Sequence, residues 1–188
     1  MPNVKGSTLQ PRIKYAKDHD TGGKWQALMD GLSPETRALI EKGIMINQWY
    51  PLTAYAELSR VIDRIYGAGD RKLIWTLGRY SADEALHGIY KMFYKVSSPD
   101  WVIKMAATVW KQYYDTGRVS IELEPVPKGR SLVMTVTDFD TPSPELWLSI
   151  GGWLHRTIEL SGGKNVRVEM LGAGPASGPR AQYRVAWD

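Results

Sequence analysis

Residues 99–124 read PDWVIKMAATVWKQYYDTGRVSIELE, and the spacing of the apolar residues changes within this stretch. From Pro99 to Tyr114 the polar side chains fall on one narrow stripe, and the remaining positions are apolar. A helix that is apolar around most of its circumference is enclosed on several sides, so this helix is predicted to be the central element. After Gly117 apolar and polar residues alternate, which is typical of a strand with one buried face. The stretch therefore predicts a helix that is followed at once by an antiparallel sheet.

The rest of the C-terminal part continues this sheet. Residues 119–124 and 132–137 alternate in the same way and predict a hairpin. A helix is predicted over residues 144–160, and two further strands over residues 166–171 and 183–187. The sequence therefore predicts an α+β fold, with a helical N-terminal half and then an antiparallel sheet of about four strands. One long helix lies between the two strand pairs.

Three predicted helix starts share the sequence Ser-Pro-acid, at residues 33–35, 98–100 and 143–145. In each of them the serine can cap free backbone N–H groups, and the proline sets the first helical φ angle. The carboxylate lies near the positive end of the helix dipole. Pro11 and Pro51 are predicted to begin two more helices.

A further helical stretch is predicted over residues 70–96, with a break near Ser81. Residues 1–22 are predicted to form a partly irregular N-terminal extension. All of these elements are expected to belong to one ligand-binding domain that spans residues 1–188, a length that suits one hydrophobic core.

The composition excludes several classes of protein. The chain has no cysteine, which excludes disulfides, thiolate catalysis and cysteine zinc sites. Its net charge of +4 comes from scattered basic residues, so no nucleic-acid partner is predicted. No apolar stretch of about 18 residues occurs, and the first thirty residues lack the apolar segment of a signal peptide. We therefore expect a cytoplasmic protein without membrane insertion.

The aromatic residues are unusual in kind, with eight Trp and ten Tyr but only two Phe. Trp and Tyr combine a large apolar body with a polar group and are common where a surface is partly wet. The pattern fits either an aromatic core, or a pocket or subunit interface. The part of the chain before Ser98 has more of these residues than the surface of a monomer needs. We therefore expect a two-fold homodimer that forms through the N-terminal helices. They are Trp49, Tyr50, Tyr55, Trp75 and Tyr80.

No set of residues for catalysis is present. The sequence contains no nucleophile elbow, Walker loop, dinucleotide-binding fingerprint or metal-binding His pair. Asp138 and Asp140 form a pair of carboxylates at a strand end, which fits capping better than acid–base chemistry. The sequence therefore predicts a protein that is not an enzyme, with no catalytic residue, no metal site and no cofactor.

Several local motifs carry a family resemblance. The most specific is the stretch from Tyr113 to Arg118, Tyr-Tyr-Asp-Thr-Gly-Arg, which follows Trp110 closely. Weaker motifs are Lys5-Gly6, Trp49-Tyr50-Pro51, Gly78-Arg79, Gly151-Gly152-Trp153-Leu154, Val166-Arg-Val168-Glu169 and Tyr183-Arg-Val185-Ala-Trp187. On these motifs nearly the whole chain resembles a myxobacterial paralogous family of proteins of this size.

That family is similar in turn to a wider superfamily. The superfamily includes four-vinyl-reductase domains, the ligand domains of aromatic-sensing transcription activators, haem–nitric-oxide-binding domains and small subunits of the TRAPP vesicle-tethering complexes. The resemblance implies a binding or sensing role, often in a dimer, with an apolar pocket between helices and sheet. It implies no common catalytic reaction.

The chain departs from these relatives at their metal sites. Four-vinyl-reductase domains have zinc-binding cysteines around the loop between the last two strands, where this chain has Gly172 and Ala181. Neither residue type binds metal, so a zinc site is excluded.

Haem–nitric-oxide-binding domains use a proximal His, then a Pro, then Tyr-x-Ser-x-Arg for the haem propionates. Here His87, Pro99 and the stretch 114–118 approach that spacing, but the interval from His to Pro is one residue shorter. His87 also shares a helix face with charged residues, which indicates contact with water. The helix that corresponds to the haem-ligand helix, residues 99–114, contains no His. We therefore interpret the match as coincidental.

These observations predict a pocket between the central helix and the sheet. Arg118 is predicted to be a polar anchor at its mouth for a carboxylate or phosphate group. The alternative for Arg118 is an ion pair with Asp115 or stacking on an aromatic ring. The residues predicted to line the pocket are Trp110, Tyr114, Met134 and Trp153.

The function predicted from the sequence is a non-enzymatic sensory or regulatory module. It is expected to bind a small apolar ligand and to act through a protein partner. One alternative is a dimeric scaffold with a filled core, similar to the TRAPP subunits. The other alternative, which the sequence favours least, is a haem gas sensor.

Overall fold

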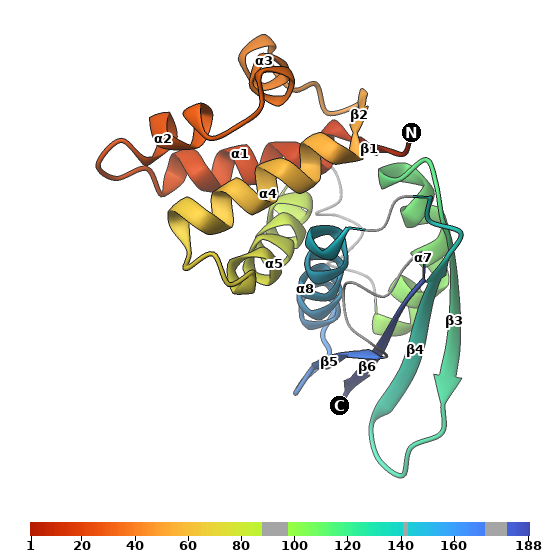
Figure 1. The fold of residues 1–188 in the computed structure, drawn as a ribbon. Coiled ribbons are helices and arrows are strands. Elements are labelled where there is room, and N and C mark those ends of the chain that lie inside the picture. The colour runs from red at the N-terminus through yellow and green to blue at the C-terminus, as the bar shows by residue number, and fades with distance from the viewer. Residues whose placement is uncertain (88–97, 141–142, 172–179) are drawn as a thin grey trace.

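The computed structural model describes residues 1–87, 98–140, 143–171 and 180–188. Figure 1 shows a helical layer built from the N-terminal half and a sheet built from the C-terminal half. A long helix lies between the two strand pairs of the sheet in the chain order. The predicted α+β fold is confirmed.

The N-terminal half consists of helices and two short strands. The helices are α1 (Gly6–Asp18), α2 (Lys24–Asp30), α3 (Pro34–Lys42), α4 (Leu52–Tyr66) and α5 (Lys72–His87). The strands β1 (Asn3–Lys5) and β2 (Trp49–Pro51) pair with each other in an antiparallel ladder. This small sheet is not predicted from the sequence, because a strand of three residues is too short to show a period.

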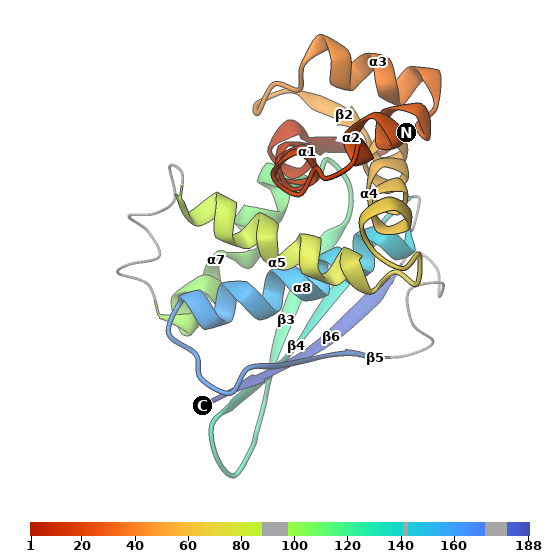
Figure 2. The same cartoon turned by 90° about the vertical axis from the view of Figure 1, so that its left-hand side faces the viewer.

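In the C-terminal half, the described residues form two helices and four strands. These are α7 (Pro99–Tyr113), β3 (Arg118–Glu124), β4 (Arg130–Thr137), α8 (Pro144–Leu160), β5 (Arg167–Leu171) and β6 (Ala181–Trp187). The strands form one antiparallel sheet in the order β3-β4-β6-β5. Residues alternate between its two faces, and α7 and α8 both lie against one face, as Figure 2 shows.

The three predicted helix starts are confirmed at atomic level. The side chains of Ser33, Ser98 and Ser143 each accept a hydrogen bond from the backbone N–H three residues further on. A proline occupies the first helical turn in each case. Such caps satisfy N–H groups that the helix itself leaves without a partner.

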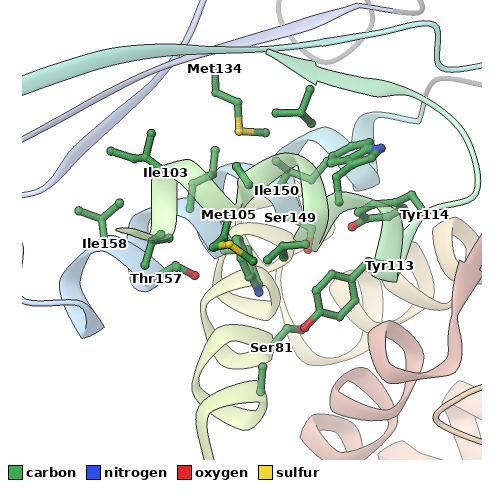
Figure 3. Close-up of a pocket in the computed structure, with 18 of the residues that line it drawn as sticks. Ser81, Ile103, Met105, Tyr113, Tyr114, Met134, Ser149, Ile150, Thr157 and Ile158 are labelled. Atoms are coloured by element: carbon green, nitrogen blue, oxygen red, sulfur yellow. The ribbon is translucent and has the colours of Figure 1, made fainter. Parts of the chain in front are cut away.

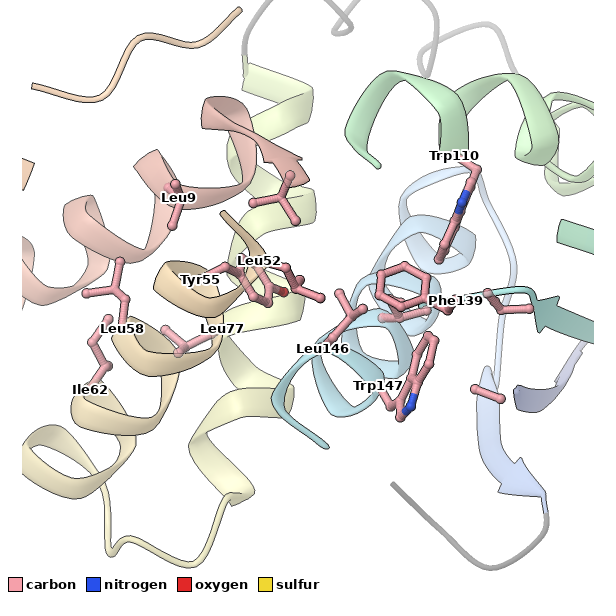
Figure 4. Close-up of a cluster of buried hydrophobic side chains, with 14 of the residues drawn as sticks. Leu9, Leu52, Tyr55, Leu58, Ile62, Leu77, Trp110, Phe139, Leu146 and Trp147 are labelled. Atoms are coloured by element: carbon pink, nitrogen blue, oxygen red, sulfur yellow. The ribbon is translucent and has the colours of Figure 1, made fainter. Parts of the chain in front are cut away.

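The core runs continuously from the helical layer to the sheet. Figure 4 shows Leu52, Tyr55 and Leu77 on the helical side, and Leu146 and Phe139 toward the sheet. Helix α8 is the central element, because it packs along α5 on one side and against β5 and β6 on the other. Of the described helices, none is long and apolar enough to cross a membrane.

The prediction that the helix over residues 99–114 is the central element is wrong. Trp110 is the buried residue of α7, whereas Trp101 and Ala107 are exposed. Helix α7 lies over the outer strand β3, and several of its apolar side chains face a cavity instead of close-packed atoms. An apolar circumference does not distinguish these two environments in a sequence.

Three further expectations about the N-terminal half are corrected. The region predicted as a partly irregular extension, residues 1–22, contains β1 and α1, and Pro11 lies inside α1. Helix α5 continues through Ser81, and the predicted stretch beyond residue 87 lies outside the described residues. Of the aromatic residues expected at a dimer interface, Tyr50 and Tyr55 are buried within the monomer. The homodimer itself stays a prediction.

Candidate functional site: an apolar cavity with a polar end

A cavity of about 110 Å³ lies between α7, α8, the N-terminal helices and the inner face of the sheet. Figure 3 shows Ile103 and Met105 of α7, Met134 of β4, and Ile150 and Ile158 of α8 around it. Its walls are mainly apolar. An engineered apolar cavity of about 150 Å³ binds benzene, so this one has room for a ligand of about that size or somewhat smaller.

The strands supply the floor of the cavity through their alternation. Val119 and Ile121 of β3 and Leu132 and Met134 of β4 all line the cavity. They occupy alternate positions of paired strands, so their side chains point to the same face of the sheet. The alternation read from the sequence therefore identifies which strand residues face the cavity.

Four of the five predicted site residues lie around this cavity. They are Trp110, Tyr114, Met134 and Trp153. Trp110 also belongs to the core: its side chain is 6% exposed, and its ring lies 4.4 Å from that of Tyr114 and 6.1 Å from that of Phe139. Its Nε1 donates to the Thr116 carbonyl oxygen over 2.9 Å. Ligand binding by these four residues stays a prediction.

Arg118 does not lie at the cavity, and its predicted role as the polar anchor is wrong for this geometry. Its side chain is 81% exposed, and its Nε donates to Asp138 Oδ2 over 2.6 Å. The physical reason is the parity of β3. Val119 faces the cavity, so the preceding residue must point to the opposite face of the sheet. Arg118 does form an ion pair, as the alternative predicts, but its partner is Asp138 instead of Asp115.

Tyr114 connects the cavity to the N-terminus of the chain. It follows the last residue of α7 and forms an isolated antiparallel bridge with Val4 of β1. The neighbouring Asp115 accepts hydrogen bonds from the backbone N–H and the side-chain Nδ2 of Asn3, both over 2.7 Å. The cavity wall and the N-terminal strand are therefore joined directly at this point.

Tyr114 is half-buried at the cavity, and its hydroxyl forms no hydrogen bond with the residues that the structure describes. In Figure 3 its oxygen is turned toward the side of the cavity where Ser149 lies. Burial raises the pKa of Tyr114 well above 10, and the nearby Arg12 charge only partly opposes that shift. The hydroxyl therefore keeps its proton at neutral pH and remains a hydrogen-bond donor.

The polar end of the cavity is built around Arg12, a residue that the sequence did not indicate as part of the site. Arg12 lies on α1 and is 1% exposed. Its Nε donates to Ser59 Oγ over 2.7 Å, and one terminal nitrogen donates to the Thr8 carbonyl oxygen over 2.8 Å. The other donates to the Tyr55 hydroxyl and to Ser149 Oγ, the latter over 2.7 Å. The guanidinium carbon also lies 3.9 Å from the centre of the Tyr55 ring.

A signal for Arg12 exists in the sequence. Leu9, Arg12 and Ala16 follow helical spacing and are all buried in α1. A charged residue in the middle of an apolar stripe indicates either a buried ion pair or a binding site. The expectation of an irregular extension over residues 1–22 hid this pattern.

The histidines lie elsewhere, as far as the structure describes them. His19 stacks on Tyr15 at the exposed end of α1. His155 Nε2 lies 3.2 Å from Glu159 Oε1, and burial together with nearby arginines lowers the pKa of His155. The side chain of His87 lies outside the described residues. Among the described residues no cluster of His, Asp and Glu is arranged to hold a metal ion.

Comparison with known proteins identifies the fold. No protein-family model and no curated protein matches the sequence. The chain is similar to the unliganded Fe(II) H-NOX protein from K. algicida, with a TM-score of 0.71, 11% identity, and coverage of 98% of this chain and 96% of that one. It is also similar to an H-NOX protein from S. oneidensis in the Fe(II)NO state, with a TM-score of 0.67, 10% identity, and coverage of 98% and 99%.

The chain therefore has the H-NOX fold. The predicted resemblance to the superfamily of haem–nitric-oxide-binding domains is confirmed at the level of the fold. At this identity the comparison does not carry a ligand or an activity over to the chain.

The described residues of the cavity do not fit haem. Ligands of drug size occupy pockets of about 300–1,000 Å³, and haem is at least as large as such a ligand. The volume of this cavity is only about 110 Å³. No described histidine lines it. Tyr and Met are residue types that can hold haem iron, and both line the cavity, but the walls leave no room for a macrocycle beside them.

Proposed function

We propose that this protein is a non-enzymatic sensory or regulatory module that binds a small ligand in the cavity between α7, α8 and the sheet. The observation that carries this proposal is the space of about 110 Å³ between helices and sheet, with mainly apolar walls and a polar end. Concave, mainly apolar sites with a few polar groups are the usual form of a small-molecule site. The H-NOX fold of the chain is compatible with this role.

The contacts of Tyr114 offer a path by which occupancy can affect the rest of the molecule. Tyr114 lines the cavity and bridges to Val4, while Asp115 holds Asn3. A ligand that displaces Tyr114 would therefore move β1 relative to α7. We propose that this movement is read by a protein partner, and that the module works in the cytoplasm as a homodimer. Membership of the myxobacterial paralogous family is part of the same proposal.

A scaffold with a filled core is the second candidate, and one observation favours it. Trp110 is 6% exposed and packs against Tyr114 and Phe139, so much of the space between α7 and the sheet is already occupied. The remaining cavity is smaller than most ligand sites. The two candidates differ in whether any small molecule enters.

Binding of benzene and toluene to the purified chain separates the two candidates. Ala106 lines the cavity, whereas Ala107, the next residue of α7, is exposed. Ala106→Leu adds three carbon atoms to the cavity wall, and Ala107→Leu adds them to the surface as a matched control. A ligand at about ten times its Kd stabilises the folded state by about 1.4 kcal/mol, which raises the melting temperature by about 3–6 °C in a chain of this size.

We expect this rise for the wild type and for Ala107→Leu, and none for Ala106→Leu. Absence of a rise with either compound in all three proteins would show that the core is filled and favour the scaffold. Titration with hemin is the third arm. We expect no sharp Soret band, and a stoichiometric band that disappears in His87→Ala would overturn the proposal in favour of a haem sensor.

A further inference from the structure

The guanidinium of Arg12 has no counterion in the folded chain. All 20 Asp and Glu residues belong to the part of the chain that the structure describes, and none of them forms an ion pair with Arg12. An arginine keeps its charge at any physiological pH. A buried charge without a partner is expensive, because removing an ion from water costs several kcal/mol that only an opposite charge can offset fully.

Neutral oxygens surround the guanidinium from four helices. Its acceptors lie on α1, α4, α5 and α8, and the weakest contact runs over 3.4 Å to Ser81 Oγ. These bonds satisfy the N–H groups but leave the net charge uncompensated. The chain therefore builds a positively charged, desolvated position at one end of an apolar cavity.

The hydroxyl groups beside Arg12 have hydrogens to donate, and within the described part of the chain they donate them to no acceptor. Tyr55 and Ser149 each accept a hydrogen bond from Arg12, so their own hydroxyl hydrogens need another acceptor. Among the residues that the structure describes, no such acceptor is within reach, and the Tyr114 hydroxyl has no partner at all. All four side chains line the cavity. One cation and several hydroxyl donors at the same end of the cavity fit a hydrogen-bond acceptor with a negative charge.

We propose that this polar end binds the carboxylate of a short-chain apolar acid. Arg12 supplies the counterion, and the hydroxyls of Tyr55, Tyr114 and Ser149 donate to the carboxylate oxygens. The N–H group that now reaches Ser81 over 3.4 Å is the one that a ligand oxygen can take over most easily. This inference rests on the proposed function, because it names the ligand class of the same cavity.

The cavity volume restricts the acid to a small size. A space of about 110 Å³ is somewhat smaller than the 150 Å³ or so that accepts the six carbons of benzene. Butyrate and isobutyrate have six non-hydrogen atoms each and are ionised at pH 7. Their apolar part faces the side chains of α7 and the sheet, while the carboxylate faces Arg12.

Titration calorimetry at pH 7 tests the proposal with pairs of equal shape. Butyrate is compared with 2-pentanone, and isobutyrate with 3-methyl-2-butanone, so that a methyl group replaces one carboxylate oxygen. A hydrogen bond to a charged group contributes about 1.5–3 kcal/mol, and about 1.4 kcal/mol corresponds to a factor of ten in Kd. We expect wild-type protein to bind each acid at least tenfold more tightly than its ketone.

The variants Tyr114→Phe and Ser149→Ala each remove one donor and leave the apolar walls in place. We expect each to weaken acid binding by about tenfold or more and to leave ketone binding unchanged. Tyr183→Phe is the control, because the Tyr183 hydroxyl is buried but donates to the Trp147 carbonyl oxygen and does not line the cavity. Arg12→Met should abolish the preference for acids. If Arg12→Met does not fold, the other two variants still decide the question.

Three results would overturn the inference. Equal binding of acids and ketones would refute the carboxylate site and leave the small-ligand function intact. A preference for acids that is as large in both Tyr114→Phe and Ser149→Ala as in the wild type would place the acid outside the cavity. Absence of binding by acids and ketones alike, together with no effect of benzene or toluene, would refute the proposed function as well.

Discussion

The contact between α5 and α8 depends on glycine at a position where no side chain fits. A Cβ atom at Gly78 would lie 2.1 Å from the carbonyl oxygen of Ser149 and 2.9 Å from its carbonyl carbon. On the partner helix, a Cβ atom at Gly152 would lie 2.0 Å from the Trp75 carbonyl oxygen. Both obstacles are backbone atoms, so no rotation of a side chain relieves them.

The size of the effect of Gly78→Ala follows from these distances. The oxygen must move by about 1.3 Å to reach an ordinary contact of 3.4 Å, which separates two helices that pack along their length. Such overpacking costs about 1–3 kcal/mol, with a shift of two backbones at the upper end of that range. Alanine regains about 1 kcal/mol through its helix propensity. We expect a net loss of about 2 kcal/mol, or about 4–8 °C in melting temperature.

Thermal unfolding followed by circular dichroism measures this loss. Thr76→Ala is the control, since Thr76 is an exposed residue of the same helix and its replacement should stabilise the protein slightly. A melting temperature of Gly78→Ala equal to or above that of the wild type would refute the close approach. Because Ser149 is also a partner of Arg12, the same variant should weaken binding of butyrate.

Two further predictions concern the core and the pH dependence. Trp110→Ala should cost about 3–5 kcal/mol because the side chain is 6% exposed and packs on two rings, and a loss under 1 kcal/mol in urea unfolding would contradict this packing. Burial opposes ionisation of Glu145, but bonds from Arg60 and Ser143 outweigh it and lower the pKa of Glu145 below its ordinary 4.5. The resulting stability is present above pH 4.5 and lost as the pH falls through the lower, folded-state pKa. Unfolding of Glu145→Gln should therefore depend less on pH below 4.5 than unfolding of the wild type.

The parts of the fold that the sequence predicts well depend on local chemistry. The Ser-Pro-acid starts at residues 33, 98 and 143 contain their own cap, so they need no tertiary contact to be recognised. The alternation over residues 118–124 and 130–137 identifies the strands and also their inner face. Both signals lie within a few residues of the chain.

The parts that the sequence does not predict depend on contacts between distant residues. The apolar circumference of α7 is typical of an enclosed helix, but here it faces a cavity on one side and is partly exposed on the other. Arg118 stands next to the aromatic residues in the sequence, but strand parity turns it to solvent. Arg118 was predicted because it is close to the aromatic residues in the sequence. The arginine at the cavity is Arg12, which donates a hydrogen bond to Ser149, a residue 137 positions further along the chain.

The polar end of the cavity depends on Arg12 and on serine residues of three other helices that accept hydrogen bonds from it. Ser59 on α4, Ser81 on α5 and Ser149 on α8 occupy positions on the inner faces of their helices, and Arg12 does so on α1. A single serine on an apolar helix face does not by itself indicate a site, because its hydroxyl can donate to a backbone carbonyl of its own helix. Together they converge on one guanidinium. An anion bound there would neutralise the charge that all four helices surround, and through Tyr114 it would also contact the end of α7. Occupancy of one small site would in this way tighten the packing of the helical layer and its junction with the sheet layer at once, which is what the proposed sensory role requires.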